Sequence, residues 1–133
     1  MSRVLALDFG EARCGCAISD PTGTLATPLE PVARPGTEQG LQRIRQLARE
    51  VGAERIVVGL PVSLAGGDRA QTRETRSFAD RLKAVVDVPV ELYDERFTTA
   101  LAHQAGGAAA LDSRAAAILL DEWLRVARPP ADR

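Results

Sequence analysis

A chain of 133 residues has room for one domain with a single core and excludes a two-lobed protein. Its composition, 45% hydrophobic and 26% charged, is that of an ordinary globular domain. A formal net charge of −1 excludes binding of nucleic acid through overall charge, so any such role must depend on a local patch.

The cysteines and the N-terminus indicate the compartment. Cys14 and Cys16 are too few for a disulfide framework, and two residues apart on a strand they share a face, where we expect small buried side chains in a reducing compartment. His103 is the one histidine, which disfavours a zinc site. Residues 1–3 lead directly into a strand without a signal peptide, and no apolar run is long enough to span a membrane, so we expect a cytoplasmic protein.

Two predicted strands open the chain, over residues 3–8 and 14–20, and the turn Gly10–Arg13 joins them. The run Val4–Leu7 is apolar throughout, which is typical of a strand covered on both faces. It ends at Asp8. Because a carboxylate is costly to bury alone, Asp8 either organises only the turn or is held charged by a metal ion or other carboxylate chemistry.

A third strand is predicted over Leu25–Val32, and Pro28 and Pro31 mark it as an edge strand. Thr37 is the predicted N-cap of a helix that stops at Gly52. Its inward face repeats at helical spacing and comprises Leu41, Ile44, Leu47, Ala48 and Val51.

The second half of the chain alternates strands and helices. Residues 55–60 form another apolar strand, followed by a glycine-rich loop over residues 62–68. A helix is predicted from about Ala70 to Val85. The alternating segment Val88–Tyr93 predicts a strand that is exposed on one face.

After a short helix over residues 98–105, we expect Asp112 to begin the last helix. The order β-β-β-α-β-α-β-α-α predicts an α/β fold, with a mixed five-stranded sheet and helices on both faces. Residues 1–127 then form one domain, and residues 128–133 a loose C-terminal tail.

Acidic residues stand at the boundaries of three predicted elements: Asp8 and the pair Asp94-Glu95 end strands, and Asp112 opens a helix. If the first strand is central, these positions can converge. Oxygen ligands suit Mg²⁺ or Mn²⁺, and two such ions about 3.5–4 Å apart clamp the attacking and leaving oxygens in phosphodiester cleavage. The alternative is that Asp112 is only an N-cap and Asp94–Arg96 a solvated turn.

A stripe of arginines lies on the predicted helix after the glycine-rich loop. Arg69, Arg73 and Arg76 are spaced i, i+4, i+7 and can follow a phosphate backbone. The alternative is a solvated face, since Asp68 and Glu74 partly offset the positive charge.

Four blocks of sequence, taken together and in this order, resemble the YqgF family of Holliday-junction-resolvase-like proteins: residues 5–10 with 13–17, residues 57–61 with Gly66, residues 94–99, and residues 112–120. The resemblance implies a ribonuclease-H-like fold and a metal-dependent endonuclease that processes the 5′ end of precursor 16S rRNA. It maps the catalytic acidic triad of the family onto Asp8, Glu95 and Asp112, which would hold Mg²⁺ or Mn²⁺, two ions when substrate is bound.

The chain departs from the family between Thr99 and Asp112, where the connection is short and lacks lysines. Substrate binding then relies on arginines, namely Arg13, Arg69, Arg73, Arg96 and Arg114. The implied partners are structured RNA (precursor 16S rRNA) or branched DNA, with ribosomal particles as a further candidate and no membrane.

Three rival functions remain open. One is a Holliday-junction-type DNA resolvase. Another is a catalytically silent module that binds nucleic acid or the ribosome. An ATP-using enzyme of the actin and sugar-kinase kind also carries an apolar-apolar-Asp-x-Gly loop, but it needs two lobes.

Two arguments disagree on whether Asp94 or Glu95 is the metal ligand at the end of the last predicted strand. By strand alternation Asp94 shares a face with Val90 and Leu92, so periodicity favours Asp94 if that face points toward the site. The resemblance favours Glu95. We choose Glu95, because we expect the strand to end near Tyr93, where alternation lapses.

Overall fold

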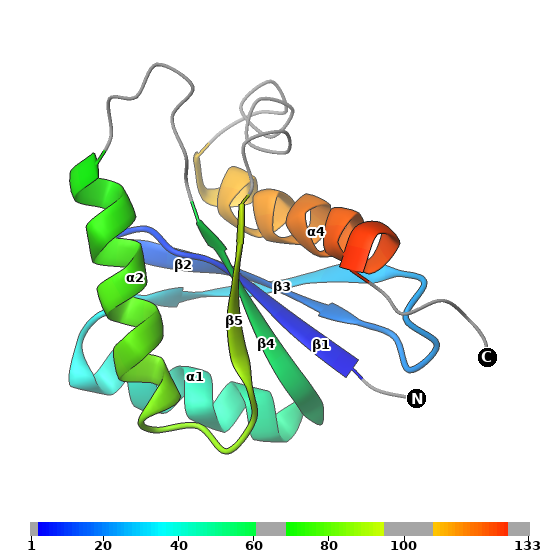
Figure 1. Cartoon of the computed structure of the whole chain (residues 1–133), viewed down its shortest axis with the longest axis horizontal. Coiled ribbons are helices and arrows are strands. Elements are labelled where there is room, and N and C mark those ends of the chain that lie inside the picture. The colour runs from blue at the N-terminus through cyan, green and yellow to red at the C-terminus, as the bar shows by residue number, and fades with distance from the viewer. Residues whose placement is uncertain (1–2, 61–68, 95–107, 128–133) are drawn as a thin grey trace.

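A five-stranded mixed sheet forms the centre of the computed structural model (Figure 1). The structure describes residues 3–60, 69–94 and 108–127. Within these ranges it describes the backbone alone for residues 60, 69–71, 94, 108–113 and 126–127. The strand order is β3-β2-β1-β4-β5. The elements are β1 (Arg3–Asp8), β2 (Arg13–Ser19), β3 (Ala26–Ala33), α1 (Glu38–Glu50), β4 (Ala53–Leu60), α2 (Arg69–Lys83), β5 (Val90–Asp94) and α4 (Ala108–Ala127).

Strand β1 lies at the centre of the sheet, as predicted. It pairs antiparallel with β2 and parallel with β4, and β5 continues the parallel half. Its side chains alternate between two buried clusters: Leu5 and Leu7 belong to one, and Val4 and Ala6 to the other. An unbroken apolar run is therefore what a central strand with two covered faces requires.

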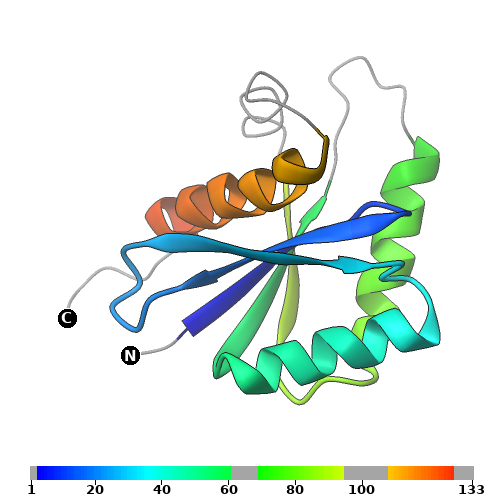
Figure 2. The ribbon, with the colours of Figure 1, turned by 180° about the vertical axis from the view of Figure 1, so that it is seen from behind.

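Helices cover both faces of the sheet, which confirms the predicted layering (Figure 1, Figure 2). Helices α1 and α2 pack on the face of Leu5 and Leu7, with Phe78 and Ile44 buried there. Helix α4 packs on the other face, where Leu119 and Trp123 are buried. We call these the α1/α2 face and the α4 face.

The predicted ends of α1 are confirmed. The Thr37 side chain accepts a hydrogen bond from the Gly40 amide, 3.0 Å long, which is the bond of an N-cap. At the other end Gly52 adopts φ +70°, a left-handed conformation that glycine takes without strain.

Helix α4 begins earlier than we predicted. Its first residue is Ala108, so Asp112 is the fifth residue of the helix and does not open it. The physical reason is that three alanines and Leu111 precede Asp112, and both residue types favour helix strongly. The alternative in which Asp112 is only an N-cap is therefore wrong.

Strand β3 is an edge strand, as its prolines predicted. Pro28 pairs with Ala17 of β2, and the register shifts between Cys14 and Cys16. Both cysteines are free and buried in the cluster on the α1/α2 face, so they are small core side chains as expected.

The expected helix over residues 98–105, the glycine-rich loop and the tail over residues 128–133 lie outside the described residues. Within the described part, no helix is both long and apolar enough to cross a membrane.

Candidate active site

The candidate site lies where the parallel strands end. Because β1, β4 and β5 are parallel, their carboxyl ends meet at one edge of the sheet, and both α2 and α4 begin at the same end of the molecule (Figure 1). Open α/β sheets bind ligands in this position. We call it the carboxyl edge.

Asp8 is the last residue of the central strand and is half-buried at the carboxyl edge. Its partner across the antiparallel pair is Gly15. On the other side Leu7 pairs with Val58, and the residue after Val58 is Gly59. Both neighbouring strands thus carry glycine beside Asp8. Glycine in a strand marks a β-bulge or a place where a ligand or another backbone comes close, and Gly15 lies at the register shift between Cys14 and Cys16.

The turn that follows Asp8 depends on Gly10. A Cβ atom at this position would lie 2.7 Å from the Arg13 carbonyl oxygen, too close for any other residue without movement of the backbone. The turn brings the chain back so that Arg13 starts β2 beside the end of β1.

Strand alternation places Asp8 on the α4 face, because it continues the series Val4, Ala6. On β5, Tyr93 packs against the same cluster, whereas Val90 and Leu92 pack on the α1/α2 face. The face of β5 that carries Val90 and Leu92 is therefore not the face of Asp8. Asp94 shares a face with Leu92, so strand alternation disfavours Asp94 as a metal ligand, which is the opposite of what we predicted from periodicity.

The end of β5 also differs from our expectation. The strand continues through Asp94, which pairs with Leu60, and does not end near Tyr93. Glu95 follows directly and lies outside the described residues. Asp94 is thus a paired residue of a strand, which corrects the alternative of a solvated turn at this position.

The backbone of α4 places position 112 toward the sheet. It precedes Ala116 by four residues and Leu119 by seven, and both of these are fully buried against the α4 face. Residues at these spacings share one side of a helix.

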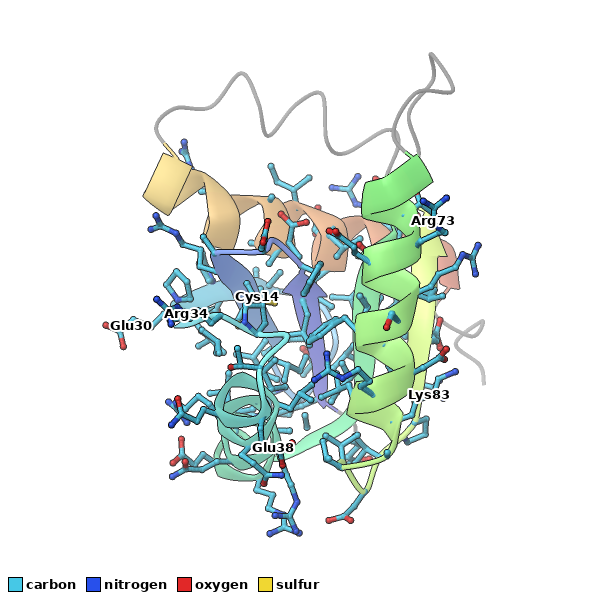
Figure 3. The ribbon with its side chains drawn as sticks, turned by 90° about the vertical axis from the view of Figure 1, so that its left-hand side faces the viewer. Cys14, Glu30, Arg34, Glu38, Arg73 and Lys83 are labelled. Carbon is cyan, nitrogen blue, oxygen red and sulfur yellow. The ribbon has the colours of Figure 1, made fainter. Side chains whose placement is uncertain are left out.

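The predicted substrate-binding arginines that the structure describes are spread around the carboxyl edge. Arg13 is exposed at the start of β2, and Arg114 is exposed two residues after Asp112 on α4. Arg73 is exposed on the side of α2 that points away from Arg34 (Figure 3). Position 69 is the first residue of α2, and Arg96 lies outside the described residues.

A polar network that we did not predict joins α4 to β5. Trp123 Nε1 donates a 2.9 Å hydrogen bond to Glu91 Oε2, and Arg55 Nη1 lies 2.7 Å from Glu91 Oε1. For β5 we predicted only that one face of the strand is exposed. The signal was present, since a buried indole usually needs an acceptor for its N–H.

Among the side chains that the structure describes, no three histidine, cysteine, aspartate or glutamate residues lie together so as to hold a metal ion. Of the predicted metal ligands, this part of the chain includes only the side chain of Asp8. Carboxylates at positions 8, 95 and 112 would supply the oxygen donors that Mg²⁺ and Mn²⁺ prefer.

Comparison with known proteins identifies the family. Residues 2–126 match RuvX, a family described as Holliday junction resolvase. The chain belongs to the RuvX family. This membership confirms the resemblance to the YqgF family inferred from the four sequence blocks.

Relatives of similar length support the assignment. A Chloroflexus aurantiacus protein named "Putative pre-16S rRNA nuclease" is 37% identical, over 98% of this chain and 91% of that protein. A Streptomyces coelicolor protein of the same name is 41% identical, over 98% of this chain and 86% of that protein.

The solved structures confirm the predicted fold. The RuvC protein of T. thermophilus, in complex with a Holliday junction substrate, aligns with a TM-score of 0.58 at 14% identity. The alignment covers 92% of this chain and 95% of RuvC. At this identity the likeness shows the fold alone, and that fold is ribonuclease-H-like.

Proposed function

We propose that this chain is a divalent-metal-dependent endonuclease that processes the 5′ end of precursor 16S rRNA. The observation that carries the proposal is the setting of Asp8, a half-buried carboxylate at the end of the central strand with a glycine on each neighbouring strand. The names of the relatives support precursor 16S rRNA as substrate. The family description makes branched DNA the second candidate.

We assign Asp8, Glu95 and Asp112 as the catalytic metal ligands. Asp8 is on the α4 face by strand alternation, and position 112 is on the sheet-facing side of α4. One residue beyond Asp94, alternation would return to the face of Tyr93, which is the α4 face. Alternation along β5 therefore disfavours Asp94, and the family resemblance favours Glu95.

When bound, Mg²⁺ or Mn²⁺ would polarise the scissile phosphate and lower the pKa of the attacking water. The residues of the chain have three tasks. The three carboxylates hold and position the ions, the two glycines let the phosphate approach the backbone, and Arg13 and Arg114 contribute positive charge toward the strand.

The test uses purified full-length protein with two labelled substrates, precursor 16S rRNA and a four-way DNA junction, each with and without Mn²⁺. We expect manganese-dependent cleavage near the 5′ end of the mature RNA, and loss of that cleavage in Asp8→Asn. Asp121→Asn is the matched control, because Asp121 lies on α4 and, among the described residues, forms its ion pair with Arg125, 2.7 Å away.

Each other outcome selects a different function. Cleavage of the junction alone supports a DNA resolvase. Binding without cleavage by the parent protein supports the catalytically silent module. If Asp8→Asn cleaves as well as Asp121→Asn does, Asp8 is a turn residue and the assignment of the site is wrong.

A further inference from the structure

A groove opens on the α1/α2 face, one residue beyond Asp8. Its larger part is a hollow of about 500 Å³, lined by Phe9, Glu11, Ala12, Arg34, Gly36 and Thr37. A smaller hollow of about 220 Å³ shares Phe9, Glu11 and Gly36 with it and extends to Arg81 on α2. We call the two together the Phe9 groove. Small-molecule sites in proteins span about 300–1,000 Å³, so the groove suits a ligand the size of a nucleobase.

Phe9 forms a fixed aromatic wall of this groove. Its ring stacks on Phe78, with centroids 4.5 Å apart and an angle of 26° between the rings, and Phe78 is itself fully buried. At Gly36 a Cβ atom would lie 3.9 Å from both Phe9 Cε1 and Arg81 Nη1. The missing side chain at position 36 therefore leaves the edge of the Phe9 ring accessible.

Arg34 is held in an unusual backbone conformation at the rim. Its φ of +46° makes it the one non-glycine residue with positive φ in the described part of the chain. The Arg34 amide donates to the Ala12 carbonyl at 2.9 Å, and the Arg34 carbonyl accepts from the Thr37 amide at 3.1 Å and the Thr37 hydroxyl at 2.8 Å.

Gly40 completes this arrangement, because a Cβ there would lie 2.1 Å from the Arg34 carbonyl oxygen. A strained backbone of this kind persists only where its surroundings determine it, often at ligand sites. Arg34 and Glu11 form no ion pair or hydrogen bond through their side chains within the described structure, and both residues are exposed. Figure 3 shows Arg34 on the surface. Both remain available to a ligand.

An aromatic ring, a guanidinium group and a carboxylate around one hollow match the chemistry of an unpaired nucleobase. Bases pack against aromatic side chains and arginine planes, and arginine and glutamate read the donor and acceptor atoms on base edges. A bare phosphate fits less well, because the carboxylates of Glu11 and Glu74 offset the positive charges of Arg34 and Arg81 around the groove.

We propose that the Phe9 groove binds one unpaired nucleobase of the substrate strand, beside the nucleotide whose phosphate lies at Asp8. This inference rests on the proposed nuclease function. Phe9 directly follows Asp8 and packs on the α1/α2 face, so a strand that crosses the carboxyl edge from Asp8 toward that face meets the groove. Because a carboxylate only accepts hydrogen bonds, Glu11 favours bases with an exocyclic amino group over uracil, whose one ring N–H donor lies between two carbonyl oxygens.

The direct test follows backbone amide signals by NMR while AMP, CMP, GMP or UMP is added to the full-length protein. We expect saturable shifts at Ala12, Gly36 and Thr37, smallest with UMP. Inorganic phosphate is the reference and should leave these amides unmoved. Equal movement with phosphate, or no saturable shift with any nucleotide, would overturn the proposal.

Two variants locate the binding. Arg34→Gly removes the guanidinium and suits the positive φ, so it should fold and bind about tenfold more weakly, as expected for loss of a charged hydrogen bond. Gly36→Leu fills the groove and should abolish the saturable shifts. Arg45→Ala, on α1 and away from the Phe9 groove, is the control and should bind as the parent does. Unchanged binding in both groove variants would refute the proposal.

The cleavage assay separates this inference from the proposed function. Arg34→Gly should raise KM with little change in kcat, because the base contact is remote from the reacting phosphate. If the parent cleaves RNA but shows no nucleotide shifts, the groove proposal fails alone. If nucleotides bind in the groove but the parent cleaves nothing, the nuclease proposal fails and the binding site stands.

Discussion

The hydrogen bond between Trp123 and Glu91 is expected to fix α4 against β5, and replacing Glu91 with leucine tests this. The two elements carry position 112 and lead into Glu95, so their relative placement matters to the candidate site. Trp123 is 8% exposed, and an N–H left without an acceptor at such a site costs about 1–3 kcal/mol. The side chains of Arg55 and Glu91 are 42% and 36% exposed, so their ion pair contributes only about 0–1 kcal/mol.

We therefore expect Glu91→Leu to lower the free energy of unfolding by about 2 kcal/mol. Glu91→Gln should cost about 1 kcal/mol, because its amide oxygen can still accept from Trp123 while exposed Arg55 turns to water. Arg55→Gln removes only the ion pair and is the matched control, with an expected loss below about 1 kcal/mol.

Urea unfolding followed by far-ultraviolet circular dichroism measures all three variants on one scale. A double-mutant cycle with Trp123→Phe isolates the hydrogen bond, with an expected coupling of about 1–2 kcal/mol. The reasoning is refuted if the coupling is zero, or if Glu91→Leu costs no more than Arg55→Gln. Either result would mean that water satisfies the indole and that another contact fixes α4.

Three further predictions concern the site and the turns. Glu95→Gln should abolish manganese-dependent cleavage at unchanged melting temperature, whereas Asp94→Asn should retain part of it; the reverse pattern in the cleavage assay would contradict the assignment of Glu95. Hydrogen bonds from the Leu25 amide and neighbouring threonines lower the pKa of Asp20, so its stabilising effect is complete above the unfolded pKa of about 3.9 and is lost as the pH falls below it. Melting curves should show Asp20→Asn less stable than the parent at pH 7 and equal to it in strong acid; a constant difference would count against the hydrogen bonds. Gly40→Ala should destabilise the protein by about 2 kcal/mol or more through its clash with the Arg34 carbonyl, and an unchanged urea midpoint would show that this turn relaxes freely.

Local patterns sufficed for most of the fold. The apolar run of β1, the prolines of β3 and the Thr37 cap each depend on short-range chemistry, and each prediction is confirmed. The prediction that α4 begins at Asp112 is wrong, because the alanines before Asp112 favour helix strongly, and this outweighs the tendency of aspartate to stand at an N-cap. Propensity over several residues prevailed over one side chain.

The site was harder to predict, because its faces depend on which helix covers which side of the sheet. Alternation along β5 is visible in the sequence, but alternation alone does not say whether Asp8 shares a face with Leu92 or with Tyr93. The structure resolves this through the packing of Tyr93 near α4. The positive φ of Arg34 could not be predicted from its neighbours alone, since it depends partly on the hydrogen bond that its amide donates to the Ala12 carbonyl, in a segment remote in sequence.

Because α4 is the described helix that covers one whole face of the sheet, the order of synthesis has a physical consequence. The strands leave the ribosome first, and the apolar side chains of Val4, Ala6 and Val57 stay in water until the C-terminal residues emerge. A domain can fold during synthesis only as far as the segments that pack against one another have been made. Apolar surface that is exposed at that stage promotes aggregation. A chain that stops at residue 107 should bind the dye ANS and precipitate at concentrations where the full chain stays clear; a clear solution without dye binding would mean that the sheet closes this face without its last helix.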